Sequence, residues 1–189
     1  DIVALVQAGR ISKARLDDAV RRVLRLKVRL GLFENPTWSV DGYDKFACEE
    51  FRQMAYNSTV ESMVLLKNEK SLLPLKKGAR ILVTGPNANS MRTLNGGWSY
   101  SWQGDRAEEF TQEYNTILEA MRNEFGANNV TYVPGVEYVP GWNWQADKVV
   151  SLDAVYRAAL SSDVVVACIG ENTYCETPGN INDLNLSAN

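Results

Sequence analysis

Apolar residues recur at helical spacing through the first third of the chain. Between residues 13 and 30 they fall on one face, and Ser12 is placed to cap the start of that helix. A second stretch, from about residue 45 to 62, has similar spacing. We therefore expect two helices here, separated by a turn at Asn35-Pro36.

After residue 62 the pattern changes to short apolar runs that alternate with helical stretches. Continuous apolar runs are typical of strands that are covered on both faces. Strand, helix, strand, helix, strand is the order expected of a parallel sheet covered by helices, an α/β fold. Short extended pieces precede it at 64–66 and 72–75; we expect strands at 80–85, 130–133 and 163–169, and helices at about 113–125 and 152–161.

Two segments lie where such sheets bind their ligands, beyond the carboxyl ends of the strands. The first, residues 94–104, lies some way past the first predicted strand and holds Trp98, Tyr100 and Trp102 among glycines. Flat aromatic faces suit the C–H faces of a pyranose ring, and glycines let a ligand approach the backbone closely. The rings could equally anchor a long loop to the core, and the residues alone leave both interpretations open.

The second segment, residues 170–180, follows the last predicted strand. Its only charged residues are Glu171 and Glu176. A single glutamate is most often a solvated surface residue. The position of this loop after a buried strand favours a site instead, in which a carboxyl group donates and accepts protons.

Composition limits the chemistry further. The chain has 189 residues, 45% of them hydrophobic and 23% charged, and no histidine. This excludes Ser-His-Asp and Cys-His catalysis as well as imidazole metal ligands. Cys48, Cys168 and Cys175 lack the spacing of a zinc or redox site; we expect free thiols, although Cys168 and Cys175 could pair. We expect no metal and no cofactor, so carboxylates are the leading proton carriers.

Charge and hydropathy indicate which partners to exclude. The net charge is −3, with both signs interspersed along the chain. This charge distribution gives no electrostatic signal for binding nucleic acid or an anionic membrane. The apolar run from Val164 to Ile169 is far shorter than the roughly 18 residues that a membrane-spanning helix requires.

Four segments, in order along the chain, together carry a recognisable pattern. They are residues 11–34; residues 62–68 with 72–75; Gly96-Gly97-Trp98 with Trp102-Gln103-Gly104; and Gly170-Glu171 with residues 174–179. Taken together they resemble glycoside hydrolase family 3, and the resemblance covers essentially the whole chain. In that family the segments correspond to the end of a (β/α)-barrel domain, the entry into an α/β sandwich domain, an aromatic loop near the sugar subsites, and the acid/base loop.

The resemblance implies retaining hydrolysis of β-linked sugars from the non-reducing end, with an oligosaccharide or aryl glycoside as substrate. One carboxylate attacks the anomeric carbon and a second, about 5–5.5 Å away, protonates the leaving oxygen. Glu176 aligns with the acid/base residue, Trp102 with an aromatic of the leaving-group subsite, and Trp98 is expected nearby. Glu171 is expected to support or electrostatically tune the loop. A β-glucosidase is the leading assignment, and a β-xylosidase follows.

The same resemblance implies the domain organisation. Residues 1–35 correspond to the end of the barrel, residues 36–62 to a linker and helix, and residues 63–189 to the first part of the sandwich. The expected fold class is an incomplete parallel-sheet α/β sandwich, preceded by helices and a linker from the end of the barrel. We expect this sequence to be an internal fragment, cut at both ends. The nucleophilic aspartate is therefore expected upstream of Asp1, in a missing barrel domain. The parent enzyme is expected to be secreted or periplasmic, and the chain alone inactive.

Two other classes of function stay open. In a non-catalytic carbohydrate-binding module, Trp98 and Trp102 would hold sugar and Glu176 would be incidental. A nucleotide-binding α/β domain is suggested by the strand that ends at Gly85-Pro86-Asn87. It is disfavoured because the chain lacks both G-x-G-x-x-G and G-x-x-x-x-G-K-[ST].

Overall fold

The computed structural model describes residues 1–37, 39–141, 143 and 145–187. Residue 38 of the predicted linker, and residues 142, 144, 188 and 189 of the predicted sandwich segment, lie outside this description. The chain divides into two compact units, residues 1–67 and residues 68–189.

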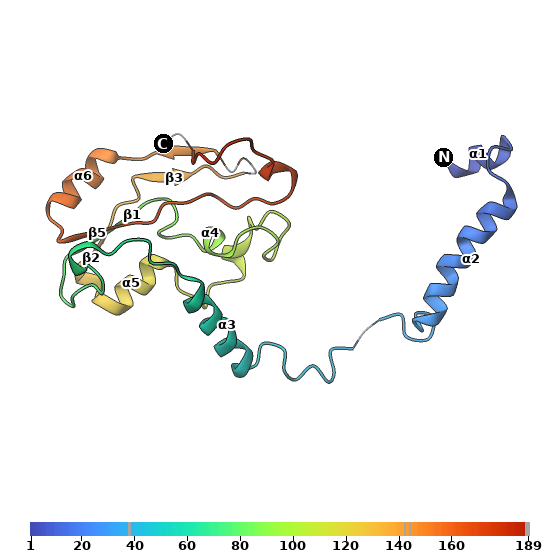
Figure 1. The fold of residues 1–189 in the computed structure, drawn as a ribbon, viewed down its shortest axis with the longest axis horizontal. Helices are drawn as coiled ribbons and strands as arrows, with labels where there is room; N and C mark the ends of the chain where they lie inside the picture. The colour runs from blue at the N-terminus through green and yellow to red at the C-terminus, as the bar shows by residue number, and fades with distance from the viewer. Residues whose placement is uncertain (38, 142, 144, 188–189) are drawn as a thin grey trace. The chain divides into compact units, whose positions relative to one another are not determined.

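The first unit is helical. It contains α1 (Ile2–Gln7), α2 (Lys13–Arg29) and α3 (Glu49–Ser62) (Figure 1). The predicted cap of α2 is confirmed, because the Ser12 hydroxyl accepts a hydrogen bond from the Arg15 N–H at 3.2 Å. None of the residues in these three helices is buried.

The start of α3 was predicted about four residues too early. Ala47 has a φ of 53°, a left-handed conformation that an α-helix cannot include. Cys48 is the N-cap, and the helix begins at Glu49. Periodicity alone extended the helix across this break.

The second unit is built on a parallel sheet, as predicted. Its strands are β1 (Ile81–Thr84), β2 (Val130–Tyr132) and β5 (Val164–Ala167), in the order β2-β1-β5, with both pairs parallel. All four residues of the central strand β1 are buried. This agrees with the continuous apolar run expected of a strand that is covered on both faces. The same expectation is wrong for β5, whose residues alternate between half-buried and exposed.

Helices α5 (Ile117–Phe125) and α6 (Leu152–Leu160) lie on opposite sides of this sheet (Figure 1). Between α5 and the sheet is the main cluster of buried residues, to which β1, α5, β2 and the segment after β5 contribute. Its members are Ile81, Val83, Ala88, Leu118, Val130 and Cys168. The predicted α/β sandwich class is therefore confirmed.

Other local features were missed or misplaced. Helix α5 starts at Ile117 rather than near residue 113, because Thr116 forms a capping box with Glu119. The extended pieces at 64–66 and 72–75 belong to no strand. The apolar pattern also did not predict helix α4 (Met91–Asn95), the antiparallel pair β3 (Val136–Tyr138) and β4 (Asp147–Val149), or the 3₁₀ turns at Glu69–Ser71, Ala107–Glu109, Ala127–Asn129 and Thr177–Gly179.

Candidate active site

The carboxyl ends of β1 and β5 lie close together, and the chain leaves both toward the candidate loops. Gly85 follows β1 with a φ of 98°, and a Cβ there would lie 2.3 Å from the Cys168 carbonyl oxygen. The Asn87 N–H donates to the same oxygen at 3.2 Å. Only glycine permits this approach of the two backbones.

Tyr138, at the end of β3, ties the two strand ends together. Its hydroxyl oxygen lies 2.6 Å from Asn87 Oδ1 and 3.0 Å from the Gly170 carbonyl oxygen, so its proton can be donated to either. Burial, and then the nearby carboxylates of Asp147 and Glu171, raise the pKa of Tyr138 to about 12. The hydroxyl therefore stays a donor at neutral pH. Sequence reasoning missed this residue because a three-residue strand is too short to show a clear alternation.

The aromatic loop, residues 94–104, exposes its tryptophans. Trp98 is 66% exposed and Trp102 is 45% exposed, which disfavours the interpretation that the rings anchor the loop in the core. The loop closes on itself, because the Trp98 N–H donates to the Trp102 carbonyl oxygen at 2.9 Å. A Cβ at Gly104 would lie 2.0 Å from the Gly96 carbonyl oxygen, so the turn needs glycine there. The loop is thus a compact turn that presents aromatic surface to solvent.

The glutamate loop, residues 170–180, places its two carboxylates in different surroundings. The Tyr174 hydroxyl donates to Glu171 Oε2 at 2.8 Å, and this hydrogen bond raises the pKa of Tyr174. Glu176 is exposed, and its carbonyl oxygen accepts from the Gly179 N–H at 2.8 Å. Glu171 is therefore engaged within the loop, whereas the Glu176 side chain is accessible to a ligand.

Hydrogen bonds around Gln103 and Cys175 join the two loops. Gln103 Oε1 accepts from the Cys175 N–H at 3.0 Å, and Gln103 Nε2 donates to the Cys175 carbonyl oxygen at 3.5 Å. The Cys175 thiol donates to the Trp102 carbonyl oxygen at 3.0 Å, and the Thr173 hydroxyl donates to the Gln103 carbonyl oxygen. The structure therefore brings the two predicted loops together. Trp102 directly precedes Gln103 in the sequence, and Glu176 directly follows Cys175.

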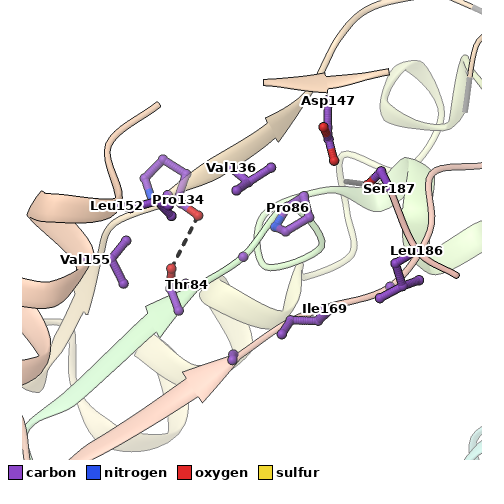
Figure 2. A pocket seen from close by; sticks show the side chains of 14 residues that line it. Thr84, Pro86, Pro134, Val136, Asp147, Leu152, Val155, Ile169, Leu186 and Ser187 are labelled. Carbon is purple, nitrogen blue, oxygen red and sulfur yellow. Dashed lines mark hydrogen bonds between the residues drawn. The ribbon is translucent and has the colours of Figure 1, made fainter. Parts of the chain in front are cut away.

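A separate cavity of about 290 Å³ lies at the carboxyl ends of the strands (Figure 2). Its walls are mostly apolar, with residues such as Val136, Leu152 and Ile169, and neither candidate tryptophan nor Glu176 lines it. Parallel sheets do bind ligands in this position. Sugar hydroxyls need convergent polar groups, however, and these walls supply few. We therefore place the candidate site at the joined loops.

The remaining candidate groups have local roles. Asp183 Oδ1 accepts from the Asn185 N–H at 2.9 Å, which shapes the turn after the glutamate loop. Cys48, Cys168 and Cys175 are free thiols. Over the part of the chain that the structure describes, no group of three or more cysteine, aspartate or glutamate side chains could hold a metal ion. In the same part, no helix has both the length and the apolar character needed to cross a membrane.

Comparison with known proteins adds independent information. A model of the glycosyl hydrolase family 3 C-terminal domain matches residues 63–189. A lysosomal beta glucosidase of Dictyostelium discoideum is 39% identical over 195 residues, which cover 100% of this chain and 23% of that protein. A periplasmic beta-glucosidase of Salmonella typhimurium is 33% identical over 189 residues, covering 89% of this chain and 24% of the relative.

A similar solved structure is the exo-1,3/1,4-beta-glucanase of a Pseudoalteromonas species. Its TM-score is 0.58 at 32% identity, and the match covers 95% of this chain and 21% of that one. The chain thus spans about a quarter of the length of the relatives it matches. Sequence and fold agree, and the chain belongs to glycosyl hydrolase family 3.

Proposed function

We propose that this chain supplies the general acid/base and the leaving-group subsite of a retaining, exo-acting β-glycosidase of the β-glucosidase type. The observation that carries the proposal is the pair of hydrogen bonds between the Gln103 side chain and the Cys175 main chain. It connects the loop that exposes Trp98 and Trp102 to the loop that bears the exposed Glu176. The beta-glucosidase and exo-beta-glucanase names of the relatives support the same substrate class.

In this proposal Glu176 acts twice. Its protonated carboxyl group donates the proton to the glycosidic oxygen as the bond to the leaving group breaks. The resulting carboxylate then takes a proton from the water that releases the sugar from the covalent intermediate. The exposed faces of Trp102 and Trp98 stack against the leaving sugar or aryl group and hold the glycosidic oxygen within reach of the carboxyl group.

The nucleophile of the proposed reaction lies in the barrel domain of the parent enzyme. Within the glutamate loop, Glu171 is engaged by Tyr174, and the nearby Asp183 shapes a turn. We therefore assign the role of nucleophile to neither residue. We also propose that the 189-residue chain alone does not hydrolyse glycosides. Residues 1–35 are the proposed end of the barrel, 36–62 the linker and helix, and 63–189 the first part of the sandwich.

The relatives also indicate a compartment for the parent enzyme. One is named lysosomal and the other periplasmic. We propose that the parent enzyme works in a secreted, periplasmic or lysosomal setting, on β-linked glucosides.

The test is the substitution Glu176→Ala in the full-length enzyme that contains this chain. Loss of a general acid should reduce the rate by roughly 10²–10⁴-fold for substrates with poor leaving groups, since these need the proton most. Dinitrophenyl β-glucoside, whose leaving group needs little protonation, should lose far less in the glycosylation step. The measurement is kcat/KM over a series of aryl β-glucosides.

Glu171→Gln is the matched control, because it changes the other carboxylate of the same loop and keeps an oxygen to accept from Tyr174. It should lose far less activity than Glu176→Ala. An equal loss for all leaving groups in Glu176→Ala would contradict the acid assignment. Sugar binding that survives the substitution, in a parent protein without hydrolytic activity, would point to a carbohydrate-binding module instead.

A further inference from the structure

Gln103 is a buried polar side chain beside an exposed site. It is 4% exposed, whereas the preceding residue, Trp102, is 45% exposed. The Gln103 carboxamide faces the peptide groups on both sides of Cys175, accepting from the N–H and donating to the carbonyl oxygen. A buried carboxamide that pairs with main-chain groups of a distant loop restrains the backbone of that loop.

Other contacts reinforce the same restraint. The Thr173 hydroxyl donates to the Gln103 carbonyl oxygen, and the Cys175 thiol donates to the Trp102 carbonyl oxygen. A Cβ at Gly97 would lie 2.6 Å from the Tyr174 carbonyl oxygen, so the two loops approach each other too closely for any side chain there. Within this contact, the side chain of Gln103 is the group that pairs with both main-chain groups of Cys175, the residue preceding Glu176.

Glu176 itself has a backbone conformation that needs support. Its φ of 57° and ψ of −136° lie in a region that favours glycine. Non-glycine residues keep such conformations only where the surrounding structure fixes them, and they occur preferentially at functional sites. On one side the restraint is the hydrogen bond from the Gly179 N–H to the Glu176 carbonyl oxygen. On the other side it is the pairing of Cys175 with Gln103.

We propose that Gln103 is the positioning residue for Glu176. It fixes the Cys175 peptide, and with it the direction in which the Glu176 carboxyl group leaves the glutamate loop. The same side chain sets the distance between that carboxyl group and the aromatic loop. This inference rests on the proposed function of Glu176 and adds a residue that does not itself touch the substrate.

The consequence is specific to proton transfer. A general acid must lie within hydrogen-bond reach of the glycosidic oxygen in the first step and of water in the second. Misplacement of a reacting group by about 1 Å can cost on the order of 10²-fold in rate. Loss of the Gln103 pairing should therefore affect the substrates that depend most on the acid, and affect activated substrates least.

The experiment compares Gln103→Leu with the unchanged full-length enzyme. Leucine is similar in size but can make neither hydrogen bond to Cys175. We expect kcat for phenyl β-glucoside to fall about 10- to 100-fold, and kcat/KM for dinitrophenyl β-glucoside to fall less than about threefold. Azide, a nucleophile that needs no general base, should raise the turnover of dinitrophenyl β-glucoside in this variant more than in the unchanged enzyme.

The matched control is Gln112→Leu, the same substitution at an exposed glutamine of the same unit. It should leave both substrates unchanged. An equal loss on both substrates in Gln103→Leu, with no effect of azide, would overturn the positioning role and leave Gln103 as a structural residue. If Gln103→Leu does not fold, the same criteria apply to Gln103→Asn, which stays polar but is too short to span the gap to Cys175.

Glu176→Ala is measured in parallel, so that failure of this inference can be told from failure of the proposed function. If Glu176→Ala shows leaving-group dependence and Gln103→Leu does not, only the positioning role fails. If Glu176→Ala shows none, the acid assignment fails, and with it the inference about Gln103.

Discussion

Residues 1–67 and residues 68–189 differ in what holds their elements in place. In the first unit, α2 has a capped start, basic residues in its last turn and apolar residues at helical spacing, yet none of its residues is buried. In the second unit, every residue of β1 is buried between neighbouring strands and helices. Local signals are thus enough to define a helix, but a buried core needs partners that are distant in the sequence.

The apolar side chains of α2 remain largely exposed. An amphipathic helix gains most of its stability from packing of that face against other elements. The large apolar side chains that stay exposed along α2 and at its end are Val20, Val23, Leu24, Leu26, Val28 and Leu30. This is the state expected of a helix whose cover is supplied by the rest of the proposed barrel domain.

The largest expected difference between the units is the cost of removing a leucine side chain. Leu82 in β1 is 0% exposed, so Leu82→Ala should lower the free energy of unfolding by about 2–5 kcal/mol. Leu24 in α2 is 44% exposed, so Leu24→Ala in the same chain should change it by less than about 0.5 kcal/mol. Urea unfolding followed by circular dichroism measures both.

A loss of more than about 2 kcal/mol at Leu24 would contradict the comparison, since it would require a packed face on α2. The full-length enzyme sharpens the same test. If the proposed barrel covers this face, Leu24→Ala should cost more there than in the 189-residue chain. An unchanged cost would count against residues 1–35 being the end of the barrel.

The sequence was most informative where a single element carries its own signal. The apolar runs at Ile81–Thr84 and Val164–Ala167 predicted parallel strands covered on both faces, because such a strand has no polar side to alternate with. Both strands are present, but only β1 is buried along its length, and the residues of β5 alternate between half-buried and exposed. Helix starts were less well predicted. The capping box at Thr116 and the left-handed Ala47 act over one or two residues and override the periodic pattern around them.

The site was predictable as two loops but not as one arrangement. Position beyond the predicted strands, together with the resemblance, identified Trp98, Trp102 and Glu176, whose roles stay predictions. The pairing of Gln103 with Cys175 joins residues 72 positions apart, and no local pattern encodes such a contact. Tyr138 was missed partly for the same reason: its strand is too short to show an alternation, and its hydrogen-bond partners lie in two other loops.

The smallest expected effect is on the pH dependence of stability. It compares an exposed ion pair between residues far apart in the sequence with an exposed pair within one helix. In the second unit, Asp163, which directly precedes β5, accepts from the Arg80 N–H at 2.8 Å and from the Arg80 guanidinium at 2.6 and 3.1 Å. These hydrogen bonds lower the pKa of Asp163 to about 2. In the first unit, Asp18 pairs with Arg22 one helical turn away, at 2.9 Å. The first pair links residues 83 apart in the sequence, and the second supports only its own helix.

Because the Asp163 pKa is lower in the folded chain than in the unfolded chain, its stabilising effect is present above about pH 4 and is lost as the pH falls toward 2. Asp163→Asn should therefore make the urea midpoint of the second unit less sensitive to pH between 4 and 2. Asp18→Asn, the matched control in α2, should leave that pH dependence unchanged. Tryptophan fluorescence reports the transition, since Trp98 and Trp102 both lie in the second unit. The long-range pair joins the residues that directly precede the two neighbouring strands β1 and β5. A pH profile of Asp163→Asn identical to that of the unchanged chain would show that this exposed pair adds nothing to the pairing of these strands.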